Sequence, residues 1–150
     1  MTTSAEAWAE VRDFALGLPA AEEDFPWGET VIKVRRKPGI PPWRKDGVHG
    51  PMFLWMGQRD AATPSVCVKL TRAHEEAVAV AGATPTTISG LGQWGWLTVR
   101  LSEVDAGLVS DWVEESYRNV APRRFVAELD ARLPTRREGT DRAGDRRGPT

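Results

Sequence analysis

Apolar residues near the start of the chain recur at the spacing of an α-helix. Between Trp8 and Leu18 they fall on one side of a helical projection, and acidic residues fall on the other side. Thr3 is followed three residues later by Glu6, which is the pattern of a capping box at a helix start. The sequence therefore predicts a helix over residues 4–18.

Four later segments have the character of β-strands. Residues 30–35, 65–70 and 96–101 alternate between apolar and polar, as strands with one buried face do. Residues 52–56 form a continuous apolar run, which favours a strand at the centre of a sheet. The residues expected to face the helices are Ile32, Val34, Val66, Val68, Leu97 and Val99.

Two further helical stripes follow. Residues 72–81 carry one, and we expect Thr71 to cap its start and Gly82 to end it. A strong apolar stripe then predicts a helix that begins at Asp105 or Ser110.

The intervening segments lack a sustained period. Residues 19–29 are expected to be a loop that includes the acidic run 22–24, and residues 36–51 a connection rich in proline and glycine. A short edge strand is expected near residues 86–88, and helical character resumes over residues 123–133.

The order of these elements predicts an α+β fold. Most strand connections are short, so the sheet should be mostly antiparallel, with the helices packed on one face as a two-layer sandwich. We expect one domain over residues 1–133, a size that can bury a substantial core. Residues 134–150 contain no large apolar side chain and are expected to be a disordered tail.

Composition narrows the classes of function. The net charge is −1, which argues against a uniformly basic nucleic-acid binder. Cys67 is the single cysteine, so an internal disulfide and a cysteine metal cluster are excluded. No apolar run is long enough to span a membrane, and we expect a cytoplasmic protein without a cofactor.

Several short motifs, in order, resemble the MmcQ/YjbR family of small bacterial proteins. The matching segments span residues 5–121. They are Phe25-Pro26-Trp27-Gly28-Glu29, Val31-Ile32-Lys33-Val34, Met52-Phe53, Val66-Cys67-Val68-Lys69-Leu70, Gly95-Trp96-Leu97-Thr98-Val99 and Glu114-Glu115-Ser116-Tyr117.

The resemblance implies a frataxin-like (CyaY-like) fold, and family members are often described as DNA-binding. One feature departs from the family pattern. Members usually join the first two of these strands by a short turn with a lysine before the Met-Phe pair, whereas this chain has Pro51 there and a longer insertion.

Cations and aromatic residues suggest a nucleic-acid interface. The segment 33–45 holds six basic residues and no acidic one. Further basic residues are expected on the sheet face opposite the helices, where cations beside aromatic rings could follow a phosphate backbone and stack on bases. The candidate residues are Lys33, Arg35, Arg36, Lys37, Trp43, Arg44, Lys45, Lys69, Trp96 and Arg100. The alternative is that these charges only solvate a sheet face and protect its edge.

A tryptophan-lined pocket for a small molecule is a second hypothesis. Trp27, Trp55, Trp94 and Trp96 could line it, with Glu29, Lys33 and Lys69 as its polar groups. A buried Glu–Lys pair there could be the acid/base site of an enzyme. The alternative is that these indoles belong to the core.

No catalytic motif is present. The two histidines, His49 and His74, have no nucleophile at a recognisable spacing, so we expect a non-enzymatic binding module. The acidic run 22–24 together with the acidic first helix could instead bind a cation, as fold analogy would suggest, although its spacing matches no calcium loop.

Overall fold

The computed structural model describes residues 3–25, 28–35, 51–57 and 63–132. The elements are α1 (Ser4–Leu16), β1 (Ala21–Asp24), β2 (Thr30–Val34), β3 (Met52–Gly57), β4 (Ser65–Lys69), α3 (His74–Ala81), β5 (Thr84–Pro85), the 3₁₀ segment η1 (Ile88–Trp94), β6 (Trp96–Arg100), the 3₁₀ segment η2 (Leu101–Glu103), α4 (Ala106–Val120) and α5 (Arg123–Arg132).

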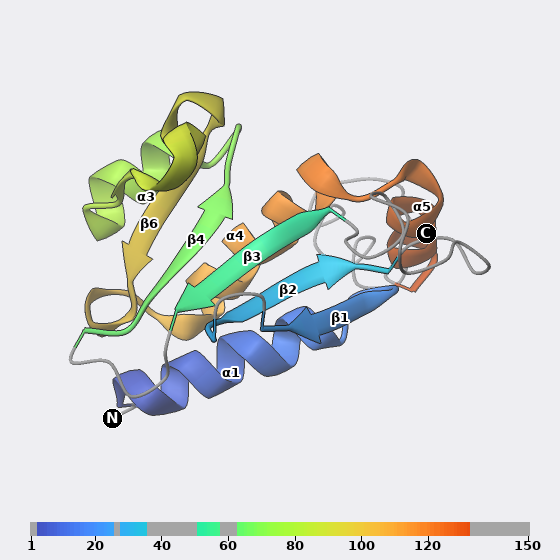
Figure 1. Ribbon diagram of the computed structural model, residues 1–150, viewed down its shortest axis with the longest axis horizontal. Helices are drawn as coiled ribbons and strands as arrows, with labels where there is room; N and C mark the ends of the chain where they lie inside the picture. The colour runs from blue at the N-terminus through green and yellow to red at the C-terminus, as the bar shows by residue number, and fades with distance from the viewer. Residues whose placement is uncertain (1–2, 26–27, 36–50, 58–62, 133–150) are drawn as a thin grey trace, which may run out of the picture.

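The strands form one open antiparallel sheet in the order β1-β2-β3-β4-β6-β5. In Figure 1, α4 runs behind β3 and β4, and α1 runs below β1 and β2. The main core lies between the sheet and the helices and draws residues from α1, α3, α4 and α5, the α-helices of the described residues. The predicted α+β sandwich with a largely antiparallel sheet is therefore confirmed. Within the described ranges, no helix has the length and apolar character needed to span a membrane.

Two irregularities in β3 explain its continuous apolar run. The pairing of β2 with β3 shifts between Thr30 and Val31 and again between Ile32 and Lys33. Each shift admits an extra residue into β3, as a β-bulge does. Phe53 and Leu54 consequently both belong to the core beneath the helices, although they are neighbours in the sequence.

The structure confirms the predicted starts of two helices and contradicts the predicted start of a third. Thr3 and Glu6 form the predicted capping box of α1. Asp105 caps α4 by accepting bonds from the backbone of Gly107 and Leu108. The expected cap of α3 by the side chain of Thr71 is wrong, because the N-cap position is Ala73 and no side-chain capping bond is made there.

Two strand expectations also need correction. Residues 21–24, expected to be part of a loop, form the edge strand β1. The short strand at the other edge comprises residues 84–85, before the expected 86–88, and η1 occupies the segment that follows. Both edge strands are short, and they carry acidic side chains or a proline, which are common protections of a sheet edge.

Candidate functional site

The sheet face opposite the helices has no α-helix of the described residues laid over it (Figure 1). We call it the helix-free face. At its centre a second apolar cluster forms from Val31, Trp55, Cys67 and Trp96, all at most 8% exposed. These side chains are cross-strand neighbours, since Val31 of β2 pairs with Trp55 of β3 and Trp55 pairs with Cys67 of β4. The central part of this face is therefore a packed cluster.

The residues of the predicted pocket are only partly brought together. The Trp55 indole N–H donates to Glu29 Oε1 at 2.9 Å, so those two side chains meet. Trp96 is buried nearby, whereas Trp94 is 64% exposed. Trp27 lies outside the described residues.

The acidic run in β1 pairs with cations on both of its sides. Asp24 Oδ2 accepts from Lys33 Nζ at 2.7 Å, and Glu22 lies 3.8 Å from a guanidinium nitrogen of Arg35. Glu23 points the other way and binds Arg12 of α1 through two nitrogens, which raises the pKa of Arg12. The alternation of residues 22, 23 and 24 follows the two-residue period of a strand.

These ion pairs reduce the number of cations that the helix-free face can offer to a ligand. Lys33 is 7% exposed, and its ammonium group is already neutralised by a carboxylate of the neighbouring strand. Arg35 is exposed but has an acidic neighbour. The structure does not support the hypothesis that residues 22–24 bind a cation. In the described part of the chain, no cluster of metal-binding side chains occurs.

Lys69 differs from Lys33 in both respects. Its side chain is half-buried at the end of β4, and its ammonium group has no hydrogen bond or ion pair within the described residues. Its backbone is held from behind by α4. The Lys69 N–H donates to Ser116 Oγ at 2.9 Å, and the Asn119 side-chain amide donates to the Lys69 carbonyl at 2.9 Å.

The serine of this arrangement joins two strands. Ser116 Oγ donates to the Phe53 carbonyl at 2.6 Å while it accepts from Lys69 N–H. β3 and β4 share one registered pair, Trp55 with Cys67, and Figure 1 shows them diverging from there. The hydroxyl therefore supplies hydrogen bonds in the region where the two strands separate.

Arg100 is exposed on the helix-free face at the end of β6, and exposed Trp94 lies just before the start of this strand. Arg100 pairs with Ser65 across β4 and is exposed, whereas Lys69 pairs with Trp96 at the other end of β6. Trp94 immediately precedes this strand. We call Lys69, Trp94 and Arg100 the β6 group. The other predicted nucleic-acid residues, Arg36, Lys37, Trp43, Arg44 and Lys45, lie outside the described residues.

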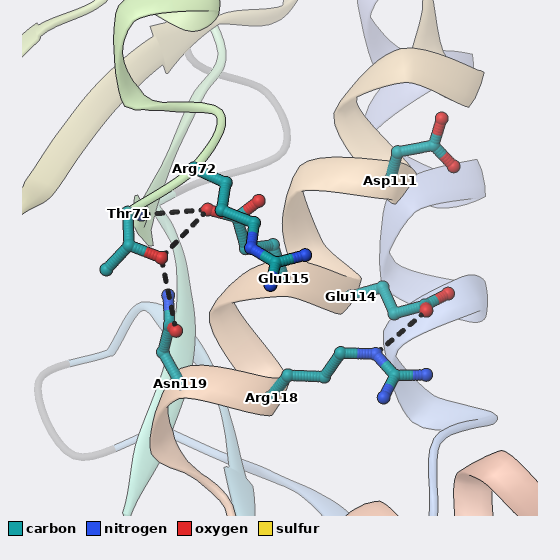
Figure 2. Close-up of a pocket in the computed structure, with 7 residues that line it drawn as sticks. All are labelled: Thr71, Arg72, Asp111, Glu114, Glu115, Arg118 and Asn119. Atoms are coloured by element: carbon teal, nitrogen blue, oxygen red, sulfur yellow. Dashed lines mark hydrogen bonds and ion pairs between the residues drawn. The ribbon is translucent and has the colours of Figure 1, made fainter.

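A polar cleft of about 480 Å³ lies on the opposite, helical side of the molecule (Figure 2). It is lined by Thr71, Arg72, Asp111, Glu114, Glu115, Arg118 and Asn119.

Much of the polar chemistry of this cleft is engaged in internal bonds. Glu115 Oε2 accepts the backbone N–H of Thr71 at 2.8 Å and of Ala73 at 3.1 Å, so this side chain of α4 holds the turn that leads into α3. Glu114 binds Arg118. Ligand pockets are mostly apolar with a few convergent polar groups, and this cleft has the opposite character. We interpret the cleft as part of the packing contact between α4 and the turn that leads into α3.

Comparison with known proteins agrees with this architecture. The sequence profile of the YjbR family matches residues 16–119. The chain belongs to the YjbR family. Among curated proteins, none matches the chain.

A solved structure extends the likeness to the fold. The crystal structure of Deinococcus radiodurans protein DR2400, which carries domain DUF419, is similar with a TM-score of 0.60 and 20% sequence identity. The similarity covers 89% of this chain and 92% of that chain. At this identity it supports the fold of the YjbR domain.

Sequence reasoning missed the residues that position Lys69. Ser116 belongs to a motif that carried the family resemblance, but its role was not predicted. A small hydroxyl residue on the buried stripe of an amphipathic helix was the available signal, because a buried polar group needs a partner. Its partners lie 47 and 63 residues away along the chain, so its periodicity could not identify them.

Proposed function

We propose that this YjbR-family protein is a non-enzymatic binding module and that it binds DNA with the β6 group of the helix-free face. The observation that carries the proposal is Lys69. Its half-buried ammonium group lacks an acidic partner within the described residues, whereas Lys33 on the same face has one. A cation held in this way is available to an external anion.

The spacing of the cations suits a phosphate backbone. Lys69 stands opposite Trp96, and Arg100 is four residues further along β6. Strand residues rise about 3.3 Å each, which places these positions about 13 Å apart. One DNA strand carries a phosphate about every 3.4 Å along the duplex axis, so both side chains can reach phosphates of a single strand.

The distribution of charge favours this face for an anionic ligand. The helical side carries acidic residues on α3 and α4, among them Glu75, Glu76 and Asp111, and these would repel a phosphate backbone. DNA should therefore be oriented toward the helix-free face. The five nucleic-acid candidates from the sequence that lie on this face in the described residues are Lys33, Arg35, Lys69, Trp96 and Arg100, and Trp94, a pocket candidate in the sequence, precedes β6.

Two variants with equal changes of charge test the proposal. In the first, Lys69→Gln and Arg100→Gln remove two cations from the β6 group. In the second, Arg72→Gln and Arg123→Gln remove two exposed cations from the helical side. The backbone bonds of Lys69 remain in the first variant, so both proteins should fold, which thermal unfolding would verify.

Binding of the full chain to a labelled DNA duplex would be followed by fluorescence anisotropy between about 50 and 200 mM salt. Each lost phosphate contact should lower the magnitude of the log–log salt slope by about 0.9, so the first variant should lose about 1.8 and the second should resemble the wild type. Equal binding by all three proteins would refute this interface. Absence of binding by the wild type to the duplex and to a single strand of the same sequence would refute DNA binding.

The small-molecule alternative is not proposed, because Trp55 and Trp96 are buried and Trp94 is exposed instead of enclosed. The frataxin-like classification that the family resemblance implies stays a prediction.

A further inference from the structure

Trp94 is set apart from the other tryptophans that the structure describes. Trp8, Trp55, Trp96 and Trp112 are between 1% and 8% exposed, and Trp94 is 64% exposed. A tryptophan carries a large apolar surface that folding ordinarily buries. An indole left in solvent by a well-packed domain is a candidate contact for a partner.

The turn that carries Trp94 is held tightly against the sheet edge. Gly92 N–H donates to the Thr86 carbonyl at 2.9 Å, and Thr86 N–H donates to the Trp96 carbonyl at 3.0 Å. A Cβ atom on Gly92 would stand 2.8 Å from the Thr86 carbonyl oxygen and 2.9 Å from Pro85 Cβ. Only glycine allows this approach, so the backbone of the turn that carries Trp94 is held against the sheet edge.

A cation lies beside this turn. Gly95 follows Trp94 with a φ of 96°, a conformation that favours glycine. Its carbonyl accepts Leu70 N–H at 3.0 Å, and a Cβ built on it would lie 3.9 Å from Lys69 Cγ. Trp94 is thus the chain neighbour of a glycine whose backbone lies against the Lys69 side chain.

We propose that Trp94 stacks on an unpaired nucleobase and that the ligand of this surface is single-stranded nucleic acid, with Lys69 contacting a phosphate. The inference rests on the proposed function and adds the class of nucleic acid. Exposed aromatic rings combined with cations on neighbouring segments are the means by which proteins bind single strands independently of sequence. In a duplex, both faces of a base are covered by its neighbours, so an indole on the surface has nothing to stack on.

The test compares Trp94→Ala with Phe25→Ala in the full chain. Phe25 is 57% exposed and follows β1, at the opposite edge of the sheet from Trp94, so it is a matched loss of an exposed aromatic ring. The probes are a labelled oligothymidine single strand and a labelled hairpin duplex, titrated by anisotropy at one salt concentration and then across salt.

We expect Trp94→Ala to weaken binding of the single strand by about 5- to 150-fold, which is the range for loss of one stacked base. Its duplex affinity and its salt slope should stay unchanged, because no cation is removed. Phe25→Ala should match the wild type with both probes, and Trp94→Phe should retain most of the affinity.

The outcomes separate this inference from the proposed function. If Trp94→Ala binds the single strand as the wild type does, or loses both probes equally, stacking is refuted. The DNA interface would still stand if the variant lacking Lys69 and Arg100 charges lost affinity in the same assay. Failure of the wild type to bind either probe would refute both proposals.

Discussion

Replacing Ser116 by alanine should destabilise the protein more than any other removal of a single oxygen atom from α4. Ser116 is fully buried, and its hydroxyl bonds to a backbone group on each of two strands. The Ser116→Ala variant leaves the Phe53 carbonyl and the Lys69 N–H without this partner. The side chain that replaces it fits, so no steric effect obscures the loss.

The magnitude follows from the surroundings of the two groups. A buried backbone group left unpaired costs about 1–3 kcal/mol. Phe53 is fully buried, so its carbonyl should incur the greater part of that penalty, whereas half-buried Lys69 can recover a bond from water. We expect a loss of about 2–4 kcal/mol in the free energy of unfolding.

Urea denaturation followed by tryptophan fluorescence would measure this loss. With a slope of about 2 kcal/mol per molar, the midpoint should fall by about 1–2 M while the slope itself stays constant. Ser110→Ala is the matched control, because Ser110 is buried on the same helix and its hydroxyl makes no hydrogen bond within the described residues. A control shift as large as that of Ser116→Ala, or a loss below about 0.5 kcal/mol for Ser116→Ala, would contradict the reasoning.

Other parts of the fold give three further predictions. Burial, with the nearby charge of Glu128, raises the pKa of Tyr117 to about 12, so folding stability should fall by up to about 3 kcal/mol as pH rises from 10 to 12. Tyr117→Phe should not show this fall when the free energy of unfolding is measured by urea titration at each pH. The same pH dependence in both proteins would count against the prediction. Glu115→Ala should lower stability by about 1–2 kcal/mol by removing the acceptor of two backbone N–H groups in the turn before α3. The amides of Thr71 and Ala73 should exchange faster, and unchanged exchange there would oppose the assigned role. Gly92→Ala should cost about 1–3 kcal/mol through its contact with backbone, and a thermal midpoint equal to that of the wild type would show that the turn can relax.

Local pattern was sufficient to predict the elements with a clear period. Alternation located β4 and β6, and the residues predicted to face the helices lie in the main core. The sequence did not predict edge strand β1 because its Glu-Glu-Asp run has no alternation of apolar and polar residues. The alternation is visible only in the structure, where successive acidic side chains pair with Arg35, Arg12 and Lys33. β1 is a strand through its backbone pairing with β2, which local propensity does not contain.

The candidate site shows the same limit. The sequence placed Lys69 and Arg100 on the face opposite the helices, and the alternation of β4 and β6 about their core residues shows that position. It treated Trp96 as a stacking residue and Trp94 as part of a pocket, whereas Trp96 is buried and Trp94 is exposed. The difference arises because η1 turns Trp94 out at the sheet edge, and the Gly92 contact that fixes this turn depends on tertiary packing.

The hydroxyl of Ser116 also constrains how the protein can fold during synthesis. β3 and β4 leave the ribosome well before α4, yet the hydrogen bonds that connect their diverging ends are supplied by that helix. Tyr117, the next residue, donates to the Pro19 carbonyl 98 positions earlier in the chain. Contacts that span most of the chain form slowly, because the intervening segment must be ordered first. A nascent chain that ends before α4 therefore cannot complete its sheet, and stable structure should appear only after residue 117 has left the exit tunnel.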